Sequence, residues 1–136
     1  MNRNVALPGS YVFGKTVTLS YEDAVKRATE ALGKEGFGVL TEIDVAATLN
    51  KKLGVVVKPY CILGACNPRL AYRALQSEPQ IGALLPCNVV VRVDDTDVTR
   101  VEIMDPQAVL RMVGNPDVVA ISVEVKERLQ RVLNAI

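Results

Sequence analysis

Residues 84–104 read LLPCNVVVRVDDTDVTRVEIM, and this stretch decides the fold class. Its first half, Leu84 to Val93, is rich in valine and predicts a strand that Pro86 interrupts near its start. Asp94 to Asp97 form a tight polar turn, and Val98 to Met104 return as the partner strand of a β-hairpin. Because a hairpin pairs neighbouring strands in opposite directions, we expect an antiparallel or mixed sheet.

Strands and helices alternate in the chain before the hairpin. Apolar or valine- and threonine-rich runs predict strands, and Ser, Asp or Asn caps followed by Gly or Pro stops predict helices. The predicted strands cover residues 11–19, 37–43, 55–57 and 60–65, and the predicted helices begin after Ser20, Asp44 and Asn67.

After the hairpin, Asp105-Pro106 begins a short helix to Val113, and Asn115-Pro116 begins another. The residues that follow alternate like a strand but also fit helical spacing. We choose the helix because the cap is clear and about 20 residues follow without a turn signal. The chain is then one α+β domain over 1–136, with an N-terminal extension over 1–10 and a C-terminal helix over 114–136. We expect a two-layer sandwich, a mainly antiparallel sheet with helices on one face.

Composition excludes several classes of function. The formal net charge is +1 and the basic residues form no stripe, so we expect no nucleic-acid partner. No apolar run reaches the roughly 20 residues of a membrane span, and Met1 to Ser10 lack the apolar core of a signal peptide. We therefore expect a cytoplasmic protein without a membrane partner. The sequence has no histidine, which excludes Ser-His and Cys-His catalytic pairs and histidine metal sites within the chain.

Two Cys-Asn pairs stand at predicted junctions between elements. Cys66 and Asn67 precede a helix, whose dipole stabilises a thiolate, and Cys87 and Asn88 stand near the start of a strand. The thiols are candidates for a redox or metal-binding pair, although cysteine also serves as a small buried hydrophobe and the spacing matches no known zinc pattern. The amides are candidates for lining a pocket. Asn67 is also a plain helix cap, whereas Asn88 is unusual because asparagine is depleted in strands.

Glu42 and Asp44 flank Ile43, so both carboxylates point to one face if the strand continues. Paired carboxylates can raise one another's pKa and serve as acid and base, or hold a cation. The simpler interpretation is that Asp44 caps the second helix and that Glu42 is solvated or paired with a lysine.

Several of these segments together resemble the domain-of-unknown-function family 302. They are Tyr21 to Ala24, Gly36 to Asp44, Ile62 to Pro68, Glu78-Pro79, Leu84 to Val91 and Asp105-Pro106, and the resemblance covers Tyr11 to Val113. The resemblance implies a TBP-like fold with a curved antiparallel sheet, and it suggests a homodimer. It points to a shared ligand-binding site made of Glu42, Asp44, Cys66, Asn67, Cys87 and Asn88. It implies no activity and no DNA binding, because a fold does not determine a function.

Three functions are compatible with this sequence. The first is a dimeric, non-enzymatic small-molecule-binding module. Its pocket lies near the ACNP motif (residues 65–68) and the LLPCNV motif (residues 84–89). The second is a thiol-based redox or metal-binding protein that uses Cys66 and Cys87. The third is a carboxylate-dependent enzyme that uses Glu42 and Asp44. No residue is assigned a catalytic or metal-binding role and no cofactor is identified, because nothing in the sequence specifies a substrate.

Overall fold

The computed structural model describes residues 10–136. Residues 1–9 of the predicted N-terminal extension lie outside the described part. The elements follow in the order β1 (Val12–Val17), α1 (Tyr21–Lys34), β2 (Gly38–Asp44), α2 (Val45–Leu53), β3 (Tyr60–Cys66), α3 (Pro68–Ser77), the 3-10 helix η1 (Pro79–Leu84), β4 (Cys87–Val93), β5 (Thr99–Met104), α4 (Pro106–Leu110), the 3-10 helix η2 (Arg111–Val113) and α5 (Pro116–Asn134). Within this part of the chain, no helix is both long and apolar enough to cross a bilayer.

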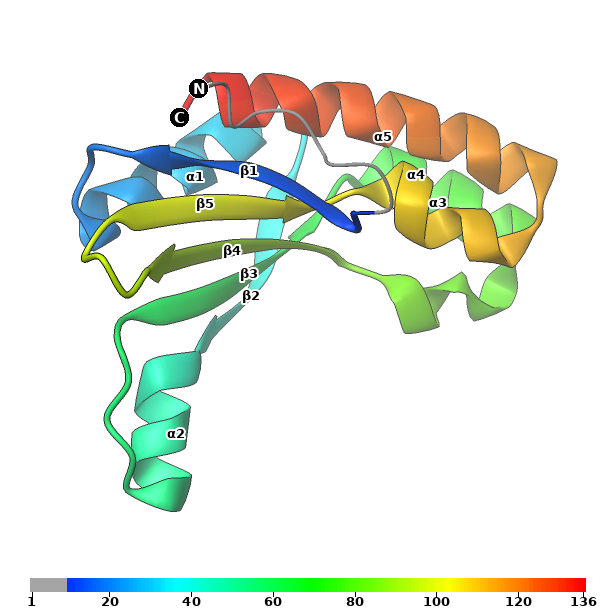
Figure 1. The fold of residues 1–136 in the computed structure, drawn as a ribbon. Coiled ribbons are helices and arrows are strands. Elements are labelled where there is room, and N and C mark those ends of the chain that lie inside the picture. Colours follow the sequence, from blue (N-terminus) through cyan, green and yellow to red (C-terminus); the bar gives the residue numbers. More distant parts are fainter. Residues whose placement is uncertain (1–9) are drawn as a thin grey trace.

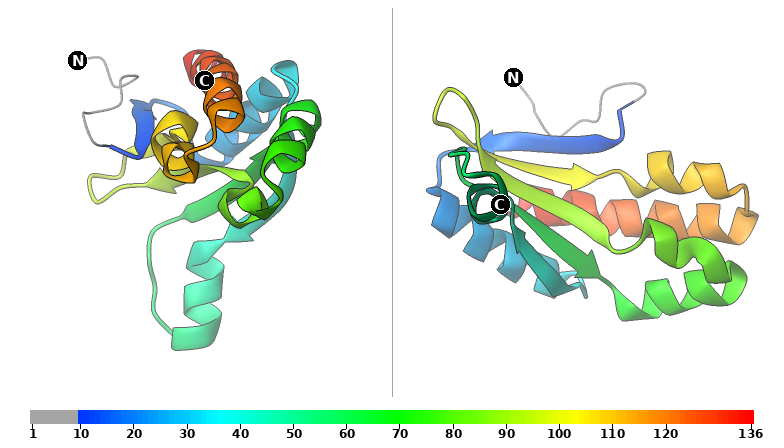
Figure 2. Two further views of the ribbon diagram at one scale, coloured as in Figure 1. Left: turned by 90° about the vertical axis from the view of Figure 1, so that its right-hand side faces the viewer. Right: turned by 90° about the horizontal axis from the view of Figure 1, so that it is seen from below.

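The strands form a five-stranded antiparallel sheet in the order β1-β5-β4-β3-β2. The predicted hairpin is its centre, with Val91 of β4 opposite Val101 of β5. Helices α1 and α5 cover one face, α3 and α4 pack on α5, and α2 projects from the opposite side (Figures 1 and 2). The predicted fold class, an α+β sandwich with an antiparallel sheet, is therefore confirmed.

The helix boundaries follow the caps that the sequence predicts. The caps share one geometry, in which a side-chain oxygen accepts a hydrogen bond from a backbone N–H of the first turn. This holds for Ser20, Asp44, Asn67, Asp105 and Asn115. The choice of a helix after Asn115 is confirmed, because α5 runs to Asn134 and buries the side of the helix that carries Val118, Val125 and Leu129.

Two local predictions differ from the structure. Residues 55–57 were expected to be extended, yet they form no strand, because this segment is exposed and has no neighbouring strand to pair with. The strand predicted from Leu84 begins at Cys87, because η1 extends to Leu84 and Pro86 cannot donate a ladder hydrogen bond.

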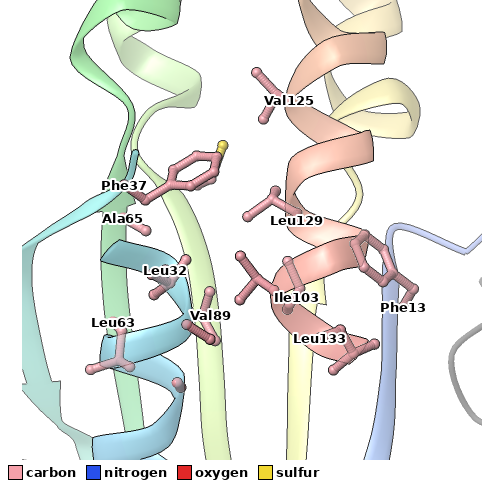
Figure 3. Packing of buried hydrophobic residues seen from close by; sticks show 14 of the residues in the cluster. Phe13, Leu32, Phe37, Leu63, Ala65, Val89, Ile103, Val125, Leu129 and Leu133 are labelled. Carbon is pink, nitrogen blue, oxygen red and sulfur yellow. The ribbon is translucent and has the colours of Figure 1, made fainter. Parts of the chain in front are cut away.

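The core lies between the sheet and the helices α1 and α5. Leu32 of α1, Val89 of β4 and Leu129 of α5 are fully buried and converge there (Figure 3). Phe13 and Phe37 supply the aromatic part of this core, and the rest is mostly Val, Leu, Ile and Ala. Burying such side chains is the main source of folding free energy, so this layer fixes where the strand ends and α3 meet.

Candidate functional site

An apolar pocket of about 280 Å³ lies where the ends of β3 and β4 meet α3 and α5. Helix α3 supplies the largest share of its wall, through Leu70, Ala71, Ala74 and Leu75. The two predicted motifs supply Cys66, Asn67 and Cys87, which the fold brings to this one pocket. None of the lining residues is an aspartate, glutamate, lysine or arginine. Its electrostatic character therefore favours an uncharged occupant.

Asn67 is fixed by two roles at the start of α3. Its Oδ1 accepts from the backbone N–H of Leu70 (3.3 Å), which caps the helix, and Pro68 occupies the first helical position. Gly36 makes room for the Asn67 amide. Its φ is +84°, and a Cβ there would lie 2.9 Å from Asn67 Nδ2. A side chain at residue 36 would therefore be strained and would push the cap out of place.

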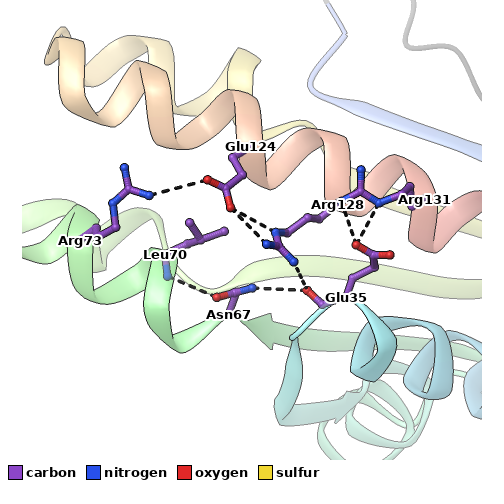
Figure 4. A network of polar contacts seen from close by, with 7 residues as sticks. All are labelled: Glu35, Asn67, Leu70, Arg73, Glu124, Arg128 and Arg131. Carbon is purple, nitrogen blue, oxygen red and sulfur yellow. Dashed lines mark hydrogen bonds and ion pairs between the residues drawn. The ribbon is translucent and has the colours of Figure 1, made fainter.

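A polar network ties the pocket wall to the other helices (Figure 4). The carbonyl oxygen of Glu35 accepts from Asn67 Nδ2 (3.4 Å) and from Arg128 Nη1 (3.2 Å). Arg128 also pairs with Glu124 at 3.3 Å. Arg131 pairs with the carboxylate of Glu35 at 3.0 Å. Because the Oδ1 and the Nδ2 of Asn67 each have a partner within the chain, this side chain positions α3, and half of its hydrogen-bonding capacity is used there.

The two pocket thiols are held in their neutral form. Burial raises the pKa of the Cys87 thiol to about 11, and the neighbouring Cys66 adds to that shift. Burial also raises the pKa of Cys66, although this residue stands at a helix N-terminus, where a lowered value was expected. Desolvation of the thiolate is the cause of the shift at this position. At neutral pH the pocket presents two protonated, weakly polar sulfur groups.

The remaining predicted site residues do not line this pocket. Asn88 alternates with the buried residues Cys87 and Val89, so its exposed side chain lies on the face of the sheet that the helices leave open. Glu42 and Asp44 pair with Leu63 and Cys61, toward the other end of β3 from Cys66.

Those two carboxylates belong to a separate environment. Asp44 Oδ1 accepts from Ala47 N at 2.8 Å and caps α2, while Glu42 is exposed. The buried Cys61 thiol is hydrogen-bonded to the phenol of Tyr21, and burial raises the pKa of both groups. Both carboxylates raise the pKa of Tyr21 further. Among residues 10–136, no group of three or more Cys, Asp or Glu side chains is arranged to hold a metal ion.

Sequence reasoning missed the apolar part of the pocket wall. Leu70, Ala71, Ala74 and Leu75 lie at helical spacing, which is typical of a helix face buried in the core, but Leu75 is 40% exposed and all four line the pocket. The available signal was the small size of the two alanines, which leave space next to the strand ends. Phe37 and Leu40 complete the wall from the β2 side.

Two comparisons with known proteins give matches. A family model described as "Domain of unknown function DUF302" matches residues 13–136. The chain belongs to the DUF302 family. The crystal structure of an uncharacterized conserved DUF302 protein from Bacillus stearothermophilus is similar to this chain, with a TM-score of 0.86 and 29% sequence identity. That similarity covers 92% of this chain and 97% of the other. No curated protein gives a significant match.

The resemblance found in the ACNP and LLPCNV segments is therefore confirmed, and DUF302 extends further along the chain than those segments indicated. The matched region continues through α5 to residue 136, whereas the motifs recognised in the sequence end before it. This extent has a structural reason, since α5 forms part of the core and supplies Ile121 and Val125 to the pocket. Neither description names a ligand, a reaction or a partner.

Proposed function

We propose that this DUF302 chain is a non-enzymatic binding module for a small, uncharged and largely apolar molecule, and that it acts as a homodimer. The observation that carries the proposal is the pocket of about 280 Å³ whose wall holds no charged side chain. This volume is close to the lower end for small-molecule pockets, roughly 300–1,000 Å³.

The polar groups in the pocket narrow the class of ligand. A sugar, a nucleotide or an amino acid would place several charged or hydroxyl groups against leucine and alanine side chains, which costs free energy without partners. The Nδ2 of Asn67 already donates a hydrogen bond to the carbonyl oxygen of Glu35, and its Oδ1 already accepts one from the backbone N–H of Leu70. The protonated thiols of Cys66 and Cys87 are weak hydrogen-bonding groups that tolerate an apolar neighbour.

The thiol alternative has one supporting observation, since Cys66 and Cys87 line the same pocket. Burial disfavours the thiolate of both residues, and the thiolate is the form that attacks disulfides and binds metals. The test is the rate of reaction with a disulfide reagent at pH 8 in native protein. Slow reaction of both thiols supports the binding module, and one fast-reacting thiol would favour the redox alternative.

The binding proposal is tested with a matched pair of fluorescent probes. N-phenyl-1-naphthylamine is uncharged and apolar, and 8-anilino-1-naphthalenesulfonate is the same molecule with a sulfonate group added. We expect saturable binding of the uncharged probe and at least about tenfold weaker binding of the sulfonate, because nothing in the pocket compensates its charge. Comparable affinity for the two probes would overturn the proposed ligand class.

A blocking variant and its control assign the probe to the pocket. Ala71→Trp on α3 fills the pocket, whereas Ala120→Trp places the same side chain on the exposed side of α5. We expect Ala71→Trp to lose most of the affinity for N-phenyl-1-naphthylamine and Ala120→Trp to keep it. Equal affinity of both variants would show that the probe binds elsewhere. Circular dichroism checks that both variants fold.

A further inference from the structure

A second apolar surface lies on the arm, which we define as residues 45–59, comprising α2 and the segment that follows it. Helix α2 has no buried residue, and every residue from Lys51 to Pro59 is exposed. Leu53 is 70% exposed and Val56 is 89% exposed. The arm projects on the side of the sheet opposite α1 and α5 (Figures 1 and 2). A contiguous apolar surface that is exposed to solvent commonly marks a site of interaction with a partner.

One strip of the sheet face beside the arm is also apolar, and it borders a charged cluster of Arg92, Arg100 and Glu102 on the same face. Ile62 pairs with Ile43 on one side and with Val90 on the other, so these three side chains form a row across β2, β3 and β4. They alternate with residues that face the helices, so the row lies on the open face of the sheet. Ile43 is 47% exposed, and the other two are half-buried.

The charge of the arm is complementary to the charge of the β4–β5 turn. The arm carries three lysines, including Lys51 and Lys52, and no acidic residue. The β4–β5 turn over residues 94–97 carries three aspartates and no basic residue. Lys58 pairs with Asp97 and Arg100 pairs with Asp94 within the chain, so the attraction between two copies draws on Lys51, Lys52 and Asp95.

We propose that a second copy of this chain covers the open face, with each arm lying on the apolar row of the other copy across a two-fold axis. A two-fold interface requires one surface that complements itself, and this chain supplies both a projecting apolar arm and an apolar row beside it. The basic arm of one copy then approaches the acidic turn of the other. The inference rests on the dimeric state proposed above and specifies the residues that create it.

The test is the mass of the full chain in solution, measured by size-exclusion chromatography with light scattering under reducing conditions. We expect twice the chain mass of 14.7 kDa for the wild type. Val56→Asp should weaken dimerisation by about tenfold or more, because the carboxylate would be buried without a partner. Met112→Asp is the matched control, since Met112 is 74% exposed but lies in η2, outside the arm and the open face.

A mixing experiment tests the reciprocal arrangement. Val90→Lys alters the apolar row and leaves the arm intact, while Val56→Asp does the opposite. Each variant alone should be monomeric, and an equal mixture should form a heterodimer, because one unaltered arm meets one unaltered row. Absence of a heterodimer would overturn the arm-on-sheet arrangement. If circular dichroism shows that Val90→Lys is unfolded, Ile43→Lys takes its place.

The outcomes separate this inference from the proposed function. A dimer that persists unchanged in Val56→Asp overturns the interface and leaves the dimeric binding module standing. A wild-type chain that stays monomeric and co-sediments with phosphatidylglycerol vesicles overturns the interface and the dimer together, and assigns the arm to a lipid surface. Probe binding in the pocket is measured separately and is independent of either result.

Discussion

At the Cys66 end of β3, apolar side chains surround a hollow, whereas at the Tyr60 end they stand on a projecting arm. Leu70 at the pocket is 5% exposed and Leu53 on the arm is 70% exposed, although both are leucines on short helices that begin with a side-chain cap. The difference comes from α5, which packs on α3, whereas α2 projects from the opposite side of the sheet (Figure 1). Similar capped helices thus line a pocket in one place and stand exposed to solvent in the other.

The largest expected difference is in stability. Leu70→Ala should lower the free energy of unfolding by about 2–5 kcal/mol, because it removes buried methyl groups and leaves a cavity. Leu53→Ala should change it by less than about 0.5 kcal/mol when the chain is diluted to a monomer. Urea unfolding at low protein concentration measures both. Equal losses would mean that the arm packs within its own chain.

Alkaline pH should destabilise the pocket end. The folded Cys87 thiol has a pKa of about 11, against an ordinary value of 9.0 in the unfolded chain. Folding therefore binds this proton more tightly, so the stabilisation is complete below pH 9 and is lost as the pH rises toward 11. The loss from this group is roughly 1.4 kcal/mol per pH unit at most. Cys87→Val should flatten the fall in unfolding free energy between pH 8 and pH 10. If Cys87→Val left the pH dependence of the unfolding free energy unchanged, the alkaline loss of stability could not be assigned to the Cys87 thiol.

Removal of the α3 cap, Asn67, should affect stability and probe binding more than removal of the α2 cap, Asp44. Asn67→Ala should cost about 1–2 kcal/mol and weaken probe binding, because Asn67 caps α3 and also donates to the Glu35 carbonyl oxygen. Asp44→Ala removes the cap of α2, which has no buried residue, and should leave the probe affinity unchanged. Asn67→Asp keeps the capping oxygen and loses the donor, so it should recover part of the stability. Equal effects of the two alanine variants on binding would break the comparison.

The smallest expected effect is at the arm-end carboxylate. Glu42→Gln should change the affinity for N-phenyl-1-naphthylamine by less than about twofold, because Glu42 is exposed and does not line the pocket. A fluorescence titration measures this affinity. A loss of much more than twofold would return Glu42 to the ligand-binding site that the family resemblance implied.

The elements could be predicted from the sequence because their signals are local. The five caps and the hairpin turn are each set by a few adjacent residues, and α5 was identified by its Asn115 cap even though its valines also alternate. The extended segment over 55–57 failed because strand formation depends on a neighbour, and the arm has none.

The candidate site was harder to predict because it depends on strand register. Asn88 was grouped with Cys87, but adjacent residues of a strand face opposite sides. Arg92 stands four residues after Asn88 and therefore on the same face of the strand. A charged residue at that position was the signal that this face is not covered by the core. The separation of Glu42 from Cys66 depends on how β2 pairs with β3, the two strands that the arm connects. This pairing contains a register shift between Val39 and Thr41. No sequence pattern specifies that register.

Methyl NMR during a titration with N-phenyl-1-naphthylamine tests the central claim most directly, because it reports on both ends of β3 at once. We expect saturable shifts of the methyl groups of Leu70, Ala74 and Val125, which line the pocket, and unchanged methyl groups of Leu53 and Val56 on the arm. Shifts confined to the arm, with the pocket methyl groups unchanged, would contradict the assignment of the pocket as the ligand-binding site.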